Sequence, residues 1–295
     1  MQLQGSITAL CTPFTESGLL DIPAWRAQID AQVSFGTAAL VVAGSTGEAA
    51  ALTDDEFCQL IELASIRVAG RIPILAGTGL SATAKTIKRT RLAKNSGADI
   101  ALVVTPPYVR PTQAGLQAHY TAVAEECEIP LVLYNVPGRT GCDLLPETAG
   151  DLSIHPNIIG LKEAVGDASR WQQLYPLAAP GFALLSGDDA TFVRTMAGGA
   201  QGVISVASNA VPAVFSRICR LISEGDIVEA GQWNAKLHPL YDFLSVEPNP
   251  VPIKAIMKQF GFGHGLRLPL LPLSEQHVPA SREMAALCRT LEQAI

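Results

Sequence analysis

A parallel (β/α)8 barrel with a C-terminal helical appendix is the fold class that this 295-residue sequence predicts, on two observations. Eight short apolar runs recur between residues 6 and 208, and segments with helical spacing lie between them. The runs are almost continuously apolar, as expected for strands covered by helices on one side and by barrel packing on the other. Strand followed by helix, repeated along the chain, is typical of a closed parallel barrel, the TIM-barrel architecture.

The predicted strands are the apolar runs themselves. In order along the chain they are 6–14, 39–45, 72–78, 100–106, 130–136, 158–164, 182–188 and 202–208. The clearest helical segment between them is 53–70, where Phe57 and Ile61 lie on one face. Thr53 followed by Glu56 forms a capping box, which marks the start of this helix.

The alternation of apolar runs and helical segments ends near Gly225. Three helical patterns follow it without an intervening apolar run, at 226–244, 251–262 and 281–294. We therefore expect a barrel domain over 1–224 that carries the catalytic groups, and a C-terminal helical domain over 225–295.

The composition narrows the functional classes. With 48% hydrophobic and 16% charged residues the chain can bury a large core. Its net charge of -6 is spread without a basic block, so nucleic acid is not an expected partner. The six cysteines show no C-x-x-C and the five histidines no H-x-x-x-H spacing, so we expect reduced thiols and no metal or other cofactor.

The N-terminal residues MQLQGSITALCTPF lack a basic segment followed by a long apolar one, and no stretch approaches the ~20 apolar residues of a membrane span. We expect a soluble, cytoplasmic protein without a membrane partner.

Barrel enzymes place their chemistry at the C-terminal ends of the strands, so the candidate residues lie there. These ends are rich in glycine and hydroxyl groups and carry a few charges. They read Thr12-Pro13, GSTGE (44–48), GTG (77–79), TPPY (105–108), YNVPGRTG (134–141), Lys162, SGDD (186–189) and ISVASN (204–209).

Lys162 ends the sixth apolar run. Burial disfavours an ammonium, and a neutral amine can attack a carbonyl to form a Schiff base. A second interpretation is a lysine at the barrel rim that forms an ion pair with Glu163 or Asp188. The position of Lys162 in the sequence favours neither interpretation over the other.

Hydroxyl groups at other strand ends could move protons. Tyr134 ends the strand beside that of Lys162, and its phenol could pass a proton to and from a reacting carbonyl oxygen, although a lone buried tyrosine more often fills a core. Ser45-Thr46 and Tyr108 strengthen the case for a proton relay.

The GSTGE loop has two readings. Its glycines allow backbone N–H groups to approach a small carboxylate, and equally they suit a tight turn before the helix that starts at Thr53. GTGLSA (77–82) resembles a dinucleotide motif, but no ribose-binding acid ends the next strand, so we exclude that reading.

Charged residues complete the set. Arg139 could bind the carboxylate of a second substrate, or it could form a surface ion pair. Asp188 and Asp189 are adjacent carboxylates without a histidine, and we assign them no metal.

Six motifs carry a family resemblance. They are GSTGE, YNVPGRTGCDLLPET, IIGLKEA, LLSGDDA, GVISVASN and EPNPVPIK. The first and third are shared across the pyruvate-dependent class I aldolases, which include N-acetylneuraminate lyase. VPGRTG and EPNP are similar to those of the dihydrodipicolinate synthases in particular, and the chain resembles this family over essentially its whole length.

The resemblance implies a reaction and its residues. Lys162 would form a Schiff base with pyruvate, while Tyr134, Ser45 and Tyr108 would relay protons. Thr46 and the backbone of Ile204 would hold pyruvate, and Arg139 would hold L-aspartate 4-semialdehyde, in the diaminopimelate and lysine pathway. The family also implies a homotetramer in which Tyr108 reaches a neighbouring active site.

The alternatives are an aldolase for a sugar-derived 2-keto acid, which would not need Arg139, and a non-catalytic binding barrel. The chain also departs from the family, which usually has threonine where this chain has Ser45, and serine lacks the methyl group that restricts the rotamer.

Members inhibited by L-lysine bind it with two histidines, an acid and a tyrosine. Those positions are Asp54, Phe57, Lys85 and Pro107 in this chain. A cation in place of the acid repels the amine of lysine, so we expect no inhibition by L-lysine.

Overall fold

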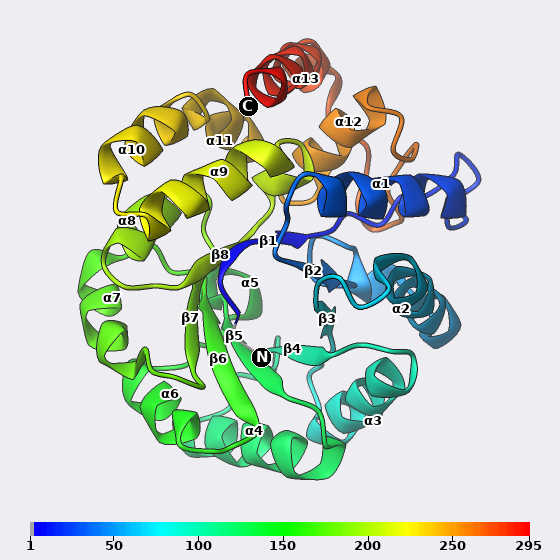
Figure 1. Cartoon of the computed structure of the whole chain (residues 1–295). Coiled ribbons are helices and arrows are strands. Elements are labelled where there is room, and N and C mark those ends of the chain that lie inside the picture. Colours follow the sequence, from blue (N-terminus) through cyan, green and yellow to red (C-terminus); the bar gives the residue numbers. More distant parts are fainter. Residues whose placement is uncertain (1–2) are drawn as a thin grey trace.

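Figure 1 shows a closed barrel of eight parallel strands ringed by helices, in a computed structural model that describes residues 3–295. The strands pair in chain order, and β1 pairs with β8 to close the barrel. Their bounds are β1 Gly5–Ala9, β2 Ala39–Val42, β3 Ile74–Gly77, β4 Ile100–Val104, β5 Leu131–Asn135, β6 Ile158–Glu163, β7 Ala183–Ser186 and β8 Gly202–Ser205. The predicted barrel is therefore confirmed.

All eight strands are shorter than the apolar runs that predicted them. After Val42, for example, Ala43 has a left-handed backbone with a φ of 52°, which ends the strand and starts the GSTGE loop. The last residues of a run can therefore belong to a loop at the C-terminal end of the barrel, where the predicted site residues gather.

The helices that accompany the strands form the outer layer of the barrel. They are α1 Ile22–Ser34, α2 Asp54–Val68, α3 Thr83–Asn95, α4 Gln113–Cys127, α5 Pro137–Thr140, α6 Pro146–Ser153, α7 Ala168–Leu174, α8 Phe192–Ala197 and α9 Pro212–Ser223. The capping box predicted at Thr53 and Glu56 is present at the start of α2.

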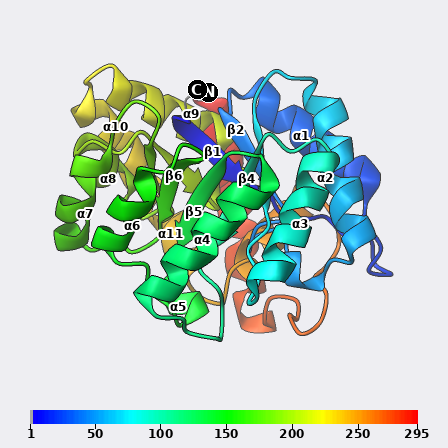
Figure 2. The same cartoon turned by 90° about the horizontal axis from the view of Figure 1, so that it is seen from below.

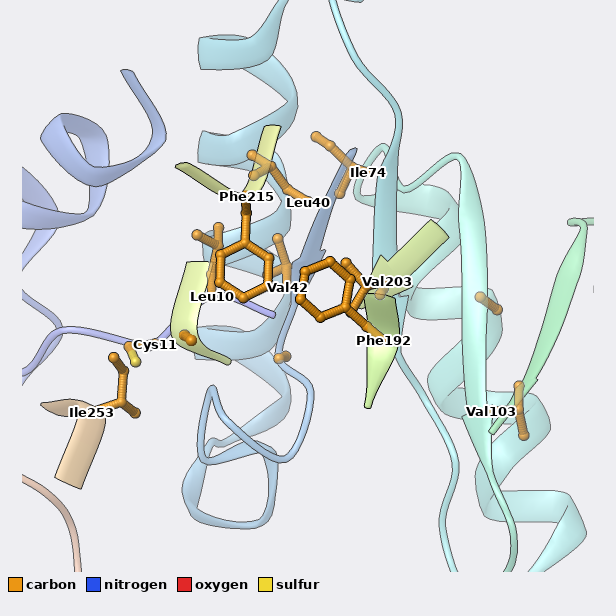
Figure 3. Packing of buried hydrophobic residues seen from close by; sticks show 14 of the residues in the cluster. Leu10, Cys11, Leu40, Val42, Ile74, Val103, Phe192, Val203, Phe215 and Ile253 are labelled. Atoms are coloured by element: carbon orange, nitrogen blue, oxygen red, sulfur yellow. The ribbon is translucent and has the colours of Figure 1, made fainter. Parts of the chain in front are cut away.

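Two apolar clusters follow from the alternation of side chains along each strand. The outer cluster lies between the strands and the helices, where Phe192 and Phe215 stack with their ring centres 5.0 Å apart (Figure 3). The inner cluster fills the barrel and includes Ile7, Tyr134 and Ile204. Tyr134 therefore points into the barrel.

Four helices follow the barrel. They are α10 Ile227–Ala235, α11 His238–Leu244, α12 Val251–Gln259 and α13 Val278–Gln293. The single helical pattern predicted over 226–244 is wrong in one respect, because it is two helices. Pro239 lacks an N–H group to donate to the carbonyl of Ala235, so the first helix ends and a second one begins.

The C-terminal helices pack against the barrel. α13 contacts α9, α11 and α12, and Figure 1 shows α12 and α13 outside the ring beside α1 and α9. In Figure 2 α5 and the orange segment before α13 lie at one end of the barrel, away from both termini. This is the end at which the strands finish. The division at residues 224 and 225 stays a prediction.

Candidate active site

Lys162 and Tyr134 lie side by side at the end of the barrel. They are register partners on the neighbouring strands β6 and β5, and Tyr134 belongs to the inner cluster. The Nζ atom of Lys162 lies 4.2 Å from the centre of the Tyr134 ring. Only 6% of Lys162 and 8% of Tyr134 is exposed. The structure thus brings a buried amine and a phenol together.

Neither acid that could have paired with Lys162 does so. Glu163 is fully buried and accepts hydrogen bonds from the Arg170 Nε atom at 2.6 Å and the backbone N–H of Val165 at 2.8 Å. Asp188 accepts a hydrogen bond from Thr191. Within residues 3–295, Lys162 forms no ion pair.

Glu163 is held by a small buried network behind the lysine. Burial raises the pKa of its carboxyl group, and Arg170 opposes that rise. Arg170 also contacts Asp143 at 3.0 Å, and Asn135 donates to both acids. The network joins the ends of β5 and β6, and it therefore supports the strands that carry Tyr134 and Lys162.

Gly187 makes room for the lysine side chain. A Cβ atom at this position would lie 2.8 Å from the Cε atom of Lys162. This is closer than carbon atoms pack, so any larger residue would displace the amine.

The GSTGE loop presents two hydroxyl groups at the same end of the barrel. Thr46 is buried, with 3% exposed, whereas Ser45 is exposed. The N–H groups of Gly47 and Glu48 close turns onto the carbonyls of Gly44 and Ser45. Of the loop's described backbone hydrogen bonds, none uses the N–H of Ser45 or Thr46, so these two donors are free to bind a ligand or water.

Arg139 lies on α5 beside the segment that precedes α12. One of its guanidinium nitrogens donates to the backbone carbonyl of Asn249 at 3.1 Å. The side-chain amide of Asn249 in turn donates to the Thr46 hydroxyl at 3.1 Å. Arg139 is exposed and forms no ion pair within the described part of the chain, contrary to the surface-pair alternative.

Tyr108 and Ile204 occupy very different positions. Tyr108 is 91% exposed on the loop after β4, with a φ of 75°, and its N–H donates to the carbonyl of Thr140. Ile204 is buried on β8 and belongs to the inner cluster with Tyr134. In residues 3–295, no hydrogen bond joins the hydroxyls of Ser45, Tyr108 and Tyr134. The relay predicted from these three groups therefore stays a prediction.

Residues near the C-terminus support the site. Lys254 lies in the EPNPVPIK motif, but no role in the site was predicted for it from the sequence. Lys254 on α12 forms a buried ion pair with Glu48, whose other oxygen accepts from the backbone N–H of Arg267 at 3.0 Å. Burial lowers the pKa of Lys254 and Glu48 opposes that change. About two hundred residues separate Glu48 from Lys254, so no spacing rule could have joined them.

The described residues contain no cluster of three or more His, Cys, Asp or Glu side chains placed to hold a metal ion. None of the helices in residues 3–295 has the length and apolar character needed to cross a membrane.

A parallel barrel with a buried lysine against a tyrosine at its strand ends has the layout of a Schiff-base-forming carbon–carbon lyase of the class I aldolase type. The chain belongs to the dihydrodipicolinate synthetase family, whose model matches residues 2–287.

Named relatives cover almost the whole chain. The 4-hydroxy-tetrahydrodipicolinate synthase of Xanthomonas axonopodis pv. citri is 56% identical over 99% of this chain and 97% of its own length. That of Stenotrophomonas maltophilia K279a is 55% identical, with 99% and 98% covered. The dihydrodipicolinate synthase of Acinetobacter baumannii, solved with pyruvate, superposes with a TM-score of 0.95 at 41% identity, covering 98% of this chain and 99% of that one.

Proposed function

We propose that this protein is a 4-hydroxy-tetrahydrodipicolinate synthase that condenses pyruvate with L-aspartate 4-semialdehyde in the diaminopimelate and lysine pathway. The observation that carries the proposal is the buried Lys162 amine, free of ion pairs in the described chain and 4.2 Å from the Tyr134 ring. Relatives that bear this activity in their names are 56% and 55% identical over nearly the full length.

The reaction needs one nucleophile and several proton transfers. The Lys162 amine attacks the keto carbon of pyruvate, and loss of water gives an imine. Loss of a proton from the methyl group of pyruvate then gives an enamine. The enamine forms a carbon–carbon bond to the aldehyde carbon of the second substrate, and the aldehyde oxygen takes up a proton. The amino group of that substrate finally attacks the imine carbon and displaces Lys162, which closes the ring and returns the free enzyme.

Each remaining residue has a proposed role. Tyr134, Ser45 and Tyr108 move the protons, as the resemblance implies. Thr46 and the backbone of Ile204 hold pyruvate. The N–H groups of Ser45 and Thr46, which make no backbone hydrogen bond in the described residues, support binding of its carboxylate. Arg139 holds the carboxylate of the semialdehyde, a role that its exposed guanidinium allows, since it forms no ion pair in residues 3–295.

The assembly is proposed to be a cytoplasmic homotetramer. Tyr108 supports an oligomer, because a large aromatic side chain that is 91% exposed on a single chain is suited to burial against a second copy. In the tetramer Tyr108 reaches the active site of the neighbouring subunit.

Borohydride trapping tests the nucleophile. With pyruvate present, reduction of the imine leaves a stable adduct, and we expect peptide mapping to place it on Lys162. Lys162→Ala abolishes the adduct, whereas Lys258→Ala, which removes an exposed lysine of α12, leaves it intact. A label on another lysine would refute the assignment.

The choice of aldehyde tests the second substrate. Purified enzyme is assayed for condensation of pyruvate with aspartate semialdehyde beside sugar-derived aldehydes. Arg139→Ala weakens use of the semialdehyde and leaves pyruvate imine formation intact. Equal loss with every aldehyde would favour the sugar-acid aldolase or a structural arginine, and no turnover of any aldehyde would favour a binding protein.

A further inference from the structure

Asn249 lies between the two proposed substrate sites. It comes directly before the segment that starts α12, far from the barrel strands in sequence. Its side-chain Nδ2 atom donates to the Thr46 Oγ1 atom, and its backbone carbonyl accepts from Arg139, both at 3.1 Å. We propose that Asn249 is a positioning residue that sets the Thr46 hydroxyl as a hydrogen-bond donor to the carboxylate of pyruvate. This inference rests on the proposed function.

The inference depends on which group donates the hydrogen bond between Asn249 and Thr46. A hydroxyl group has one proton to donate and lone pairs to accept. Because Thr46 accepts from the amide of Asn249, its own proton is directed elsewhere. Thr46 is buried and its hydroxyl donates to no acceptor in residues 3–295, so that proton is available to a ligand in the barrel mouth. A carboxylate accepts hydrogen bonds only, and it therefore fits a hydroxyl held in this way.

The surrounding structure holds the two partners in place. Glu48, two residues after Thr46, forms a buried ion pair with Lys254, five residues after Asn249. Glu48 also accepts from the backbone of Arg267. The loop is thus joined to α12 by this ion pair and to the segment before α12 by the Asn249 amide. The ion pair fixes the backbones, and Asn249 fixes the direction of one hydroxyl.

Two substitutions separate polarity from shape. Asn249→Ala removes the donor and allows the Thr46 hydroxyl to rotate, so the KM for pyruvate rises about tenfold. Asn249→Asp keeps the shape but offers only acceptors, so the Thr46 proton turns away from pyruvate. The new charge also repels the substrate carboxylate, and the KM for pyruvate rises about a hundredfold. The kcat changes less than KM in both variants.

The pH dependence of the pyruvate KM is a further test, because a loss of packing alone would not make this KM depend on pH. Protonation allows the carboxyl of the Asn249→Asp variant to donate to Thr46, so its pyruvate KM recovers as pH falls, whereas that of Asn249→Ala does not. In a Thr46→Val background, Asn249→Ala has little further effect on this KM, because its partner is already gone.

The matched control is Asn157, a half-buried asparagine before β6 whose side chain donates at 3.1 Å to the carbonyl of Ala124. Asn157→Ala and Asn157→Asp leave the pyruvate KM unchanged.

The outcomes are distinct. If Asn249→Asp is milder than Asn249→Ala, or if the Thr46→Val and Asn249→Ala effects add, the residue acts by shape and the inference is wrong. Borohydride trapping on the unaltered protein is run in parallel. If the adduct forms on Lys162 but the Asn249 variants behave like the unaltered protein, this inference alone is wrong. If no adduct forms, the proposed function is wrong.

Discussion

At the scale of single residues, the environment of Lys162 distinguishes a lysine that acts as a nucleophile from one that forms an ion pair at the barrel rim. The two look alike in sequence. The acid directly behind it, Glu163, is engaged by Arg170, and Asp188 by Thr191. What lies against the Lys162 amine is the ring of Tyr134. A cation gains some stabilisation over such a ring, but the site leaves the amine free to meet a carbonyl compound.

Tyr134→Phe is expected to lower kcat about 100-fold to 10,000-fold and to change the pyruvate KM far less, because the lost hydroxyl acts in proton transfer. The measurement is steady-state kinetics with both substrates varied. Tyr120→Phe is the matched control, since Tyr120 is also buried but its hydroxyl donates at 3.2 Å to the backbone of Val103. A near-normal rate in Tyr134→Phe would remove the relay role.

At the scale of elements, the segment after α12 is tied to the start of α2. Arg267 donates to the Glu56 carboxylate through two nitrogens, and the Arg267 guanidinium lies 4.2 Å from the centre of the Phe14 ring. The hydrogen bond from Arg267 lowers the pKa of Glu56 from 4.5 to about 2. Glu56 is also the capping-box acid of α2, so one carboxylate serves both a helix start and a contact between distant segments.

Glu56→Gln is expected to lower the free energy of unfolding by about 1 to 2 kcal/mol at pH 7, a modest value because a fifth of the side chain is exposed to solvent. The folded pKa lies below the unfolded one, so the stabilisation is complete above pH 4.5 and is lost as pH falls toward 2. Urea unfolding at several pH values measures it.

The unaltered protein and Glu56→Gln should therefore converge in acid. Asp55→Asn, at an exposed neighbour on the same helix, serves as the control and changes stability little. A difference that persists unchanged to pH 2 would contradict the ion-pair origin.

At the scale of the whole molecule, Asp54 and Phe57, two of the positions expected to bind L-lysine in inhibited family members, contact this chain's own cations. Asp54 accepts from Lys88 at 3.1 Å and from Arg89 at 2.8 Å, so its carboxylate is engaged. The Arg89 guanidinium lies 3.9 Å from the centre of the buried Phe57 ring. Lys85 is exposed on α3 and adds a further positive charge.

L-lysine is therefore expected to cause no inhibition at submillimolar concentration. The measurement is a titration against initial rate at subsaturating pyruvate. Lys85→Glu, which restores an acid, is the comparison variant and should gain affinity for the amine if the position faces the ligand. Saturable inhibition of the unaltered enzyme would show that the argument from Lys85 is wrong.

The oligomer leads to a complementation prediction. Tyr108→Phe and Lys162→Ala are each expected to be nearly inactive alone. If Tyr108 serves the neighbouring site, mixed oligomers carry sites in which an intact lysine meets an intact tyrosine, and activity returns. Co-expression with two affinity tags isolates the mixed species. No recovery in verified mixed oligomers would place Tyr108 in its own subunit's site or outside the relay.

The sequence by itself determined the barrel, its strands and the residues at their ends. These follow from local properties, because apolar periodicity and capping residues act over a few neighbours along the chain. It also predicted Lys162 and Tyr134 as neighbours, since consecutive strands in a closing barrel pair in order. It missed the helix break at Pro239 between α10 and α11.

Only the tertiary structure decided which residues contact the side chains at the strand ends. Whether Lys162 pairs with Glu163 depends on Arg170, which a helix after β6 brings to that acid. The link from Asn249 to Thr46, and that from Lys254 to Glu48, each join residues more than two hundred positions apart. Such contacts leave no periodic trace in the sequence, because they arise where the closed barrel and the C-terminal helices meet, and the closure of the whole chain sets their geometry.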